Sequence, residues 1–472
     1  MAQPYDFMDF QAELENINQR HFHRVFRPEH TIERDKYALH ELLAVDPLAE
    51  EQYLEGWARS YYSGQQHLEA IFQYAHEDIP LSALHQQTWT DAIQAIRTEL
   101  RSLPRVRAFS VLTELDQIDF QAQTAAGYDY QGVKGDKDGE NHRRAISRAK
   151  ATLWSALNPS EGMDHVIRTH VPDVGYTRTQ LTNLAEKLKV RGVWGRAFHY
   201  ILLEGTAANP LIQMFQTQQS FFHIGMDPTV SVPRLLSYVK SKAKWLIALD
   251  WQAFDASVNR FEIDQGFDLL KELVFFPDPE TETAFEISRQ LFKHKKIAAP
   301  DGNTYWSHKG LPSGSYYTML IGSIVNRLRI EYLWRVTQGH GPIVCFTQGD
   351  DSLSGDNSLI NPEDFAQVSG PLGWTMNPAK TEISTIPESV TFLGRSSSGG
   401  LNQRDIIKCL RLLIYPEVPV TSGDISAFRA TSIAQDVGGT SSRLNEVARK
   451  LRRKYGIAEE SKVPRDLRRY FA

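Results

Sequence analysis

Residues 343–355 place two adjacent carboxylates where a divalent cation could bind. Their sequence is IVCFTQGDDSLSG, in which β-branched and aromatic residues lead into Gly-Asp-Asp and a second apolar stretch follows. This pattern predicts two strands joined by a tight turn, with Asp350 and Asp351 at the tip. Mg²⁺ takes hard oxygen ligands and only one or two carboxylates from any one element, so a second acidic element is required. Gly and Asp are also common in ordinary turns, which leaves a plain hairpin as the alternative.

A second acidic element lies upstream. The apolar run 245–249 ends on Asp250, and Asp255 follows five residues later. A carboxylate that ends a strand lies at the rim of a sheet, where α/β folds place their ligands. Asp also ends strands and caps helices for structural reasons alone. Two strand-end acidic sites in one chain nevertheless favour a shared cation site.

Between the two acidic elements, residues 310–318 read GLPSGSYYT and lead into a helical run. Ser313 or Ser315 could cap that helix, and Gly314 allows the backbone to approach a ligand closely. Polar or small residues that fall toward one side of the helix are Thr318, Gly322 and Asn326. Taken by itself, the segment predicts no more than a capped core helix behind a Pro/Gly turn.

The order of these three segments resembles the palm motifs A, B and C of viral RNA-dependent RNA polymerases. The wider pattern adds AGY at 126–128, KGD at 134–136 and GLPSGS at 310–315, and it is most similar to the polymerases of partitiviruses, small double-stranded RNA viruses. The resemblance covers residues 120–395 well and the two ends loosely. The three palm motifs together are specific, whereas the closer placement is less so.

The resemblance implies an α+β fold shaped as a right hand, with fingers, a palm and a short helical thumb. The palm would be an antiparallel sheet with helices, built on an RRM-like core. The expected parts are an N-terminal region with fingers (1–235), palm with motif A (236–258), a fingers insertion (259–305), palm with motifs B to E (306–398), and thumb with a basic C-terminal segment (399–472).

The family's chemistry is two-metal nucleotidyl transfer from NTPs to an RNA 3′-hydroxyl. Asp250, Asp350 and Asp351 would hold two Mg²⁺ ions about 3.5–4 Å apart, with Mn²⁺ as a substitute. Lys380, in a segment similar to motif D, would protonate the pyrophosphate leaving group, although an exposed turn lysine is equally expected there. Asp255 would bind the ribose 2′-hydroxyl. Its usual asparagine partner is replaced by Gly322, so Asn326, Ser313 or another group could take that role.

Further residues are carried over from the resemblance to motifs B, E, F and G and to the thumb. The expected nucleotide-binding residues are Asp255, Ser313, Gly314, Thr318, Asn326, Lys189, Arg191 and Arg196. The expected RNA-binding residues are Gly175, Thr177, Arg178, Phe392, Arg449, Arg452 and Arg453. Without the resemblance, the alternating basic residues of 187–196 would be a solvated strand face.

Composition agrees with a globular protein of two or three lobes. The 472 residues are 41% hydrophobic and 23% charged, and no apolar run is long enough to span a bilayer. Net charge is −5, but residues 441–472 carry ten Lys or Arg against four Asp or Glu, which leaves −11 on the rest. A basic tail on an acidic body is compatible with a protein that channels nucleic acid internally. The two cysteines, Cys345 and Cys409, predict no disulfide framework and a reducing compartment.

Apolar spacing also predicts local structure outside the motifs. Helices are expected in 9–19, 39–43, 49–63, 68–74, 88–103, 362–370 and much of 404–472, and residues 391–395 read as a strand.

The expected partners are RNA template and product, NTPs and a viral capsid protein, without a membrane. The expected location is the virion interior and the host cytoplasm. Two alternatives stay open. Reverse transcriptases share the palm but usually carry Tyr-x-Asp-Asp and lack an acidic residue at the Asp255 position. A non-catalytic, capsid-associated RNA-binding scaffold could have kept the fold.

Overall fold

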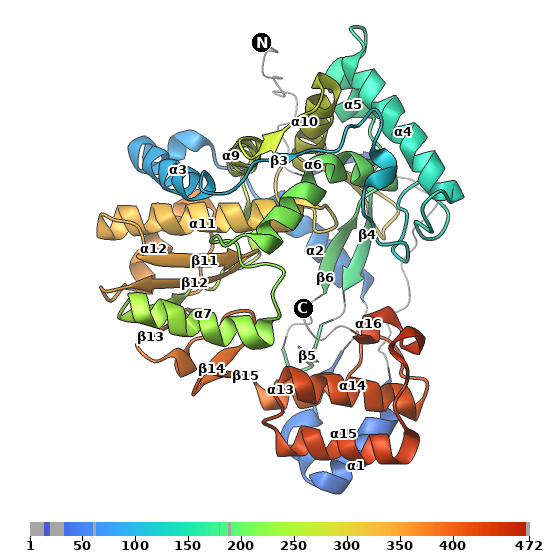
Figure 1. Cartoon of the computed structure of the whole chain (residues 1–472), viewed down its shortest axis with the longest axis vertical. Helices are drawn as coiled ribbons and strands as arrows, with labels where there is room; N and C mark the ends of the chain where they lie inside the picture. The colour runs from blue at the N-terminus through green and yellow to red at the C-terminus, as the bar shows by residue number, and fades with distance from the viewer. Residues whose placement is uncertain (1–13, 19–32, 60–62, 179, 187–189, 469–472) are drawn as a thin grey trace.

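Both acidic segments lie on strands of one sheet in the computed structural model, which describes residues 14–18, 33–59, 63–178, 180–186 and 190–468 (Figure 1). The strands are β1 Leu14–Asn18, β2 Trp57–Ala58, β3 Val106–Arg107, β4 Asp173–Arg178, β5 Thr182–Asn183, β6 Arg191–Gly195, β7 Trp245–Ala248, β8 Val274–Phe275, β9 Lys295–Ala298, β10 Thr304–Ser307, β11 Val344–Gln348, β12 Asp351–Asp356, β13 Glu382–Ser384, β14 Ser396–Ser398 and β15 Leu401–Gln403.

The helices alternate with these strands along the described part of the chain. They are α1 Lys36–Val45, α2 Gly64–Phe72, α3 Gln86–Leu100, α4 Glu140–Leu157, α5 Gly162–Thr169, α6 Phe198–Thr217, α7 Pro228–Lys242, α8 Phe254–Ser257, α9 Arg260–Lys271, α10 Pro279–Lys293, α11 Tyr317–Gln338, α12 Pro362–Ser369, α13 Ile406–Ile414, α14 Gly423–Asp436, α15 Ser442–Tyr455 and α16 Arg465–Arg468. No helix in the described ranges is long and apolar enough to cross a membrane.

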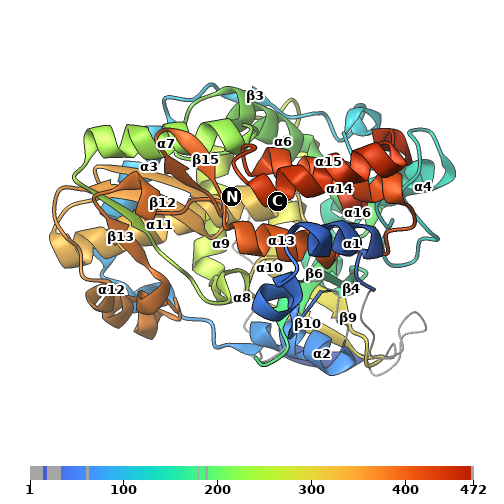
Figure 2. The same ribbon diagram turned by 90° about the horizontal axis from the view of Figure 1, so that it is seen from below.

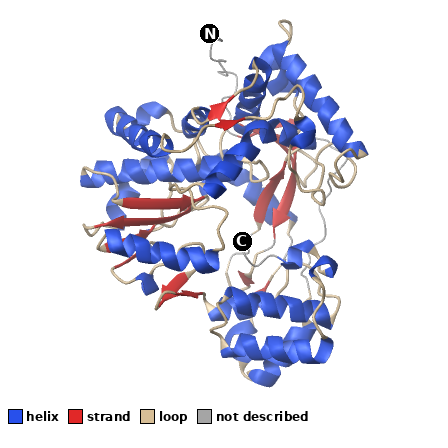
Figure 3. Cartoon of the chain, viewed as in Figure 1, coloured by secondary structure: helices blue, strands red, loops and turns tan. Residues whose placement is uncertain are grey.

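A four-stranded antiparallel sheet in the order β11-β12-β7-β13 carries the acidic segments. Its strands alternate between two buried faces. Ile247 and Leu249 belong to the core that includes α11, whereas Leu246 and Ala248 pack with the apolar residues of α7. Figure 3 shows the sheet between these two helices. Because one residue in two points to each side, both helices are fixed relative to the ends of the strands.

A second sheet, in the order β1-β10-β9-β4-β6, lies beside the first. Strands β4 and β6 form its antiparallel edge pair, and β4 runs parallel to β9. Helices α4, α5, α6 and α10 pack together around a separate core that includes Phe198, Leu202 and Leu291. The ribbon β4–β6 extends from this region toward the C-terminal helices (Figure 1).

The C-terminal helices share their core with a segment from the beginning of the chain. Leu42 of α1 packs with Leu410, Leu444 and Leu451, and Figures 1 and 2 both show α1 alongside these helices. A buried ion pair between Asp35 and Arg429, at 2.6 Å, holds the two together. Within the expected N-terminal region of 1–235, helix α1 therefore packs with the C-terminal helices.

Several local expectations are corrected. The helix expected over 9–19 is contradicted at 14–18, which form strand β1 against β10; the remaining residues of that span lie outside the described ranges. Within 49–63, the chain forms a short π-helical turn, Glu50–Leu54, and then strand β2. In both places pairing with distant strands overrides the local helical spacing. The helices at 39–43, 68–74, 88–103 and 362–370 are confirmed within a few residues.

Candidate active site

The turn between β11 and β12 carries Asp350 at its outermost position. The strands pair Gln348 with Asp351, which leaves Gly349 and Asp350 as the two turn residues. Gly349 has φ of +60°, a left-handed conformation that glycine adopts without strain. The Asp350 side chain is exposed at this end of the sheet. The predicted hairpin is therefore confirmed, with Asp350 in its turn and Asp351 at the beginning of the second strand.

Asp250 follows β7 after one residue, Leu249, and β7 is the neighbour of the hairpin strand β12. Strands β7 and β12 are antiparallel with Ile247 opposite Ser354, and the same register continued by three residues puts Asp250 opposite Asp351. The two acidic segments thus lie at the same end of two neighbouring strands.

The carboxylates at this end of the sheet repel one another, and burial together with this repulsion shifts the pKa of two of them. Burial, together with the charge of Asp350, raises the pKa of Asp351 to about 7. Burial and Asp350 also raise the pKa of Asp255 to about 6, while the positive charge of Arg191 acts in the opposite direction. Like-charged carboxylates held this close favour the protonated forms unless a cation neutralises them.

The donor chemistry fits Mg²⁺, which prefers hard carboxylate oxygens and fills its remaining positions with water and phosphate. In the described part of the chain, no three His, Cys, Asp or Glu side chains converge as a ready-made metal centre. Asp351 accepts hydrogen bonds from the backbone N–H groups of Ser352 and Leu393, at 3.1 and 2.7 Å. Each of its carboxylate oxygens keeps a further acceptor site.

The loop before α11 is held between Asp255 and strand β6. The N–H of Leu311 donates to the backbone carbonyl of Asp255 at 2.8 Å. The Ser313 hydroxyl accepts a hydrogen bond from the N–H of Trp194 at 3.1 Å. A Cβ at Gly314 would lie 2.0 Å from the Trp194 carbonyl oxygen, so only glycine fits there. Ser313 and Gly314 thus fix the position of this loop.

Lys380 lies at the same end of the sheet as Asp250. It ends the 3-10 turn Pro378–Lys380, and its side chain is exposed. The next residue, Thr381, accepts a hydrogen bond through Oγ1 from the N–H of Asp250 at 3.4 Å. The turn that carries Lys380 therefore runs alongside the first carboxylate.

One family's sequence pattern matches residues 33–452, and that family is described as viral RNA-dependent RNA polymerase. The chain belongs to this family. Its curated relatives include the RNA-directed RNA polymerase of Cryptosporidium parvum virus 1 (strain KSU-1), 26% identical over 34% of this chain and 31% of the relative. The RNA-directed RNA polymerase of Atkinsonella hypoxylon virus (isolate 2H) is 22% identical over 58% of this chain and 47% of the relative. The chain spans less than half the length of either.

The fold agrees with this membership. The crystal structure of the RNA-dependent RNA polymerase of a human picobirnavirus superposes with a TM-score of 0.66 at 17% identity, covering 90% of this chain and 85% of that one. Its insertion-loop deletion mutant gives a TM-score of 0.63. The expected α+β right-hand polymerase fold is confirmed.

The basic strand expected as motif F begins the ribbon that faces Asp255. Lys189 lies outside the described residues, whereas Arg191 starts β6 and is exposed. The residues compared with motif G, Gly175, Thr177 and Arg178, lie on the paired strand β4, with Arg178 opposite Arg191. Two guanidinium groups directly opposite each other repel, which makes this end of the ribbon favourable for an anion.

Arg196 does not have the expected phosphate-facing position. Its guanidinium is almost wholly buried, 3.8 Å from the Asp173 carboxylate and 3.1 Å from that of Glu204. It also donates to the backbone carbonyl of Leu291 at 2.8 Å. Because these partners all lie inside the protein, the prediction that Arg196 contacts a triphosphate is wrong.

Asn326 is also buried, and its amide is committed to the protein. Its Nδ2 donates to the carbonyls of Gly349 and Asp351 at 2.9 and 3.2 Å, and its Oδ1 accepts from the Trp251 indole at 2.9 Å. Direct binding of Asn326 to a nucleotide is therefore contradicted. The side chain instead joins α11 to the segment after Asp250 and to the acidic hairpin.

Phe392 does not lie on a strand that could support RNA. It is fully buried and packs against His223 with ring centroids 5.6 Å apart. Residues 392–395 form a tight turn, in which Leu393 and Gly394 have φ of +52° and +68°. Positive φ at both central positions is the type I′ pattern, which the local apolar sequence hides. Both the strand and the RNA contact at Phe392 are corrected.

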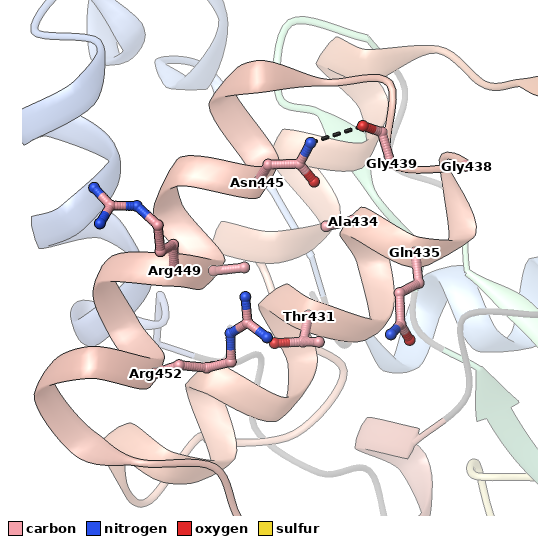
Figure 4. Close-up of a pocket in the computed structure, with 9 residues that line it drawn as sticks. Thr431, Ala434, Gln435, Gly438, Gly439, Asn445, Arg449 and Arg452 are labelled. Atoms are coloured by element: carbon pink, nitrogen blue, oxygen red, sulfur yellow. Dashed lines mark hydrogen bonds between the residues drawn. The ribbon is translucent and has the colours of Figure 1, made fainter.

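The basic residues expected in the thumb lie on α15. Arg452 and Arg453 are exposed, and Arg449 pairs with Glu446 at 2.7 Å. A groove of about 540 Å³ between α14 and α15 is lined by Arg449 and Arg452 (Figure 4). The exposed positive charges along α15 are compatible with binding of a polyanion.

Sequence reasoning missed two buried residues, Lys295 and Tyr74, that bind backbone carbonyls of the loop before α11. The buried Lys295 donates through Nζ to the carbonyls of Lys309 and Gly310, at 2.5 and 2.7 Å. The Tyr74 hydroxyl donates to the carbonyl of Leu311 at 2.7 Å. A lysine in a basic run is normally exposed, so the sequence carried no signal of this role.

Proposed function

We propose that this chain catalyses template-directed RNA synthesis, the transfer of nucleotides from NTPs to an RNA 3′-hydroxyl, for transcription and replication of a viral RNA genome. The observation that carries the proposal is the placement of Asp250 and the acidic hairpin at the same end of one sheet. Thr381, next to Lys380, binds the Asp250 N–H, and the charges of Asp350 and Arg191 act on Asp255. Such a constellation combines a cation site with groups for sugar and phosphate.

Asp250, Asp350 and Asp351 would hold two Mg²⁺ ions, with Mn²⁺ as a substitute. When bound, the cations would lower the pKa of the attacking hydroxyl and neutralise the leaving pyrophosphate. Arg191 would pair with the triphosphate, and Asp255 would accept a hydrogen bond from the ribose 2′-hydroxyl. Lys380 would give its proton to the pyrophosphate oxygen from which the transferred nucleotide departs.

We also propose which residue ranges form the parts of the right-hand fold. We assign 236–258 and 306–398 to the palm, 259–305 to a fingers insertion, and 399–472, joined by α1, to the thumb. RNA template and product and NTPs are the substrates and ligands. Because the matched relatives are viral polymerases, we also propose a capsid protein partner and action within the virion and the host cytoplasm.

The test is a gel assay with purified protein, a primed single-stranded RNA template and Mg²⁺. Extension by the four rNTPs that depends on template sequence is the expected result. Preferential extension by dNTPs would support a reverse transcriptase instead. RNA binding without any metal-dependent extension, in Mg²⁺ or Mn²⁺, would support the non-catalytic scaffold.

A further inference from the structure

The buried carboxylate of Glu204, on α6, reaches the beginning of α11. Its Oε2 accepts hydrogen bonds from the Tyr316 N–H and the Ser315 hydroxyl, both at 2.9 Å. Its Oε1 lies 3.1 Å from Arg196 Nε. Helix α11 has no capping side chain at its own N-cap, Tyr316. Glu204 therefore binds the N-cap residue directly, and it also holds the Ser315 hydroxyl, which accepts from the Tyr317 N–H at 3.1 Å in the first turn of α11.

The same carboxylate joins two segments of the chain that both lead to Asp255. Arg196 follows β6, the strand that begins with Arg191, and Ser315 ends the loop whose Leu311 N–H binds the Asp255 carbonyl. A buried ionised carboxylate is costly unless charged and polar partners compensate it. Here Arg196, which follows β6, supplies the positive charge, and Ser315 and Tyr316, at the beginning of α11, supply the hydrogen bonds. The Glu204 carboxylate is therefore compensated only when both segments are in place.

We propose that Glu204 is a positioning residue for the incoming nucleotide. It holds the strand that carries Arg191 and the loop beside Asp255 in one arrangement, so that phosphate and sugar meet their partners together. The inference rests on the proposed function and extends it to a residue that touches no substrate.

The test replaces Glu204 with Gln, which keeps the shape but removes the charge and turns one acceptor into a donor. We expect the KM for rNTP, and the Kd measured by calorimetry with Mg²⁺–NTP, to rise roughly tenfold, the effect of one charge-assisted hydrogen bond. The rate at saturating NTP should stay within about twofold, because the carboxylates at the sheet edge are untouched. Ser315→Ala should raise KM less, and little further in the Glu204→Gln background.

Asp35 offers a matched control. It is equally buried and likewise accepts from helix N–H groups, a serine hydroxyl and an arginine, namely Tyr37, Ala38, Ser426 and Arg429. Asp35→Asn should lower Tm without changing the NTP Kd.

The outcomes distinguish failure of the proposed function from failure of the role proposed for Glu204. Absence of NTP binding and extension in the wild type would remove the proposed function itself. An active wild type whose Glu204→Gln variant has a lower Tm and unchanged KM and Kd would reduce Glu204 to a purely structural group. If Glu204→Gln does not fold, an unchanged KM in Ser315→Ala would overturn the proposal equally.

Discussion

At the scale of single residues, position in the sheet separates the acidic groups by role. Asp350 is exposed at the hairpin tip, and Asp351 accepts two backbone N–H groups. Burial and the charge of Asp350 raise the pKa of Asp255, and the charge of Arg191 lowers it. The side chain with the freest oxygens is thus the one at the outermost position. This difference explains why Asp350 and Asp351 need not contribute equally to binding a cation.

Asp255→Ala tests sugar selection. Loss of the carboxylate removes the acceptor for the 2′-hydroxyl, and the efficiency ratio of rNTP to dNTP should fall by roughly tenfold or more. The ratio is measured as kcat/KM for each nucleotide in the same primed complex. Asp264→Ala, which removes a half-exposed carboxylate paired with Lys293, should leave it unchanged. An unaltered ratio in Asp255→Ala would exclude Asp255 from this role.

Lys380→Leu tests proton transfer. If Lys380 protonates the leaving group, the single-turnover rate should fall by about 10²–10⁴-fold. Lys380→Arg should rescue only part of it, because a guanidinium holds its proton far more tightly. Lys408→Leu, an exposed lysine on α13, serves as the control. A wild-type single-turnover rate in Lys380→Leu would mean that another group, or water, supplies the proton.

The sequence predicted the acidic hairpin and the strand before Asp250, but not the burial of several residues expected around them. Asp250 and Asp350 stand out because an apolar strand ends on each. Arg196 and Phe392 carry the right residue types, but their burial is decided by contacts with Asp173, Glu204 and His223, which are distant in the chain. Residue type and spacing cannot tell a phosphate-binding arginine from a buried, paired one.

At the scale of elements, α11 acts as the support of the acidic hairpin. Besides the Asn326 contacts, Ser323 Oγ accepts from the Gly349 N–H at 2.8 Å, and the Ser323 carbonyl accepts from the Thr347 hydroxyl at 2.8 Å. The helix is apolar enough to be predicted as core. Its polar residues are the ones that bind the hairpin backbone, a role visible only once the two elements are packed together.

Asn326→Ala separates support from sugar recognition. It leaves the Trp251 indole and two hairpin carbonyls without partners, so Tm should fall and the rate of nucleotide addition should fall by about 10²-fold, the effect of a small misplacement of reacting groups. The rNTP to dNTP ratio should not change. A selective loss of that ratio at normal rate would instead make Asn326 the ribose partner.

Strands inside the motifs were predictable because alternating apolar residues define two buried faces. Strand β1 and the turn at Leu393–Gly394 were not, since β1 depends on pairing with β10 and the turn depends on a leucine with positive φ. Such a leucine is uncommon without tertiary support. Here the Leu393 N–H donates to Asp351, which provides it.

At the scale of the whole molecule, helix α1 packs against helices from the other end of the sequence, and positive charge is concentrated in the C-terminal segment. Helix α1 packs with the C-terminal helices through a buried core and the Asp35–Arg429 pair. The C-terminal segment carries an excess of positive charge, and its helix α15 exposes Arg452 and Arg453. Like charges at this density repel unless a polyanion lies nearby.

Reversal of Lys450, Arg452 and Arg453 to Glu tests the thumb surface. Each neutralised phosphate contributes roughly 0.7–0.9 to the salt slope of RNA binding, so the slope should flatten by about two units. Product length per binding event should fall while single-nucleotide addition stays nearly normal. Reversal of Arg234, Lys240 and Lys242 on α7 is the matched control. Wild-type salt dependence and product length in the α15 variant would indicate that this face contacts protein.

The most direct test of the account is the single-turnover rate of nucleotide addition by Asp350→Asn in Mg²⁺, with RNA affinity measured on the same preparation. Asn keeps the size of the side chain and removes the charge at the hairpin tip, so addition should be abolished while RNA binding stays within a few-fold of wild type. A variant that binds RNA normally and adds nucleotides at nearly the wild-type rate would contradict the assignment of this hairpin as the catalytic metal site.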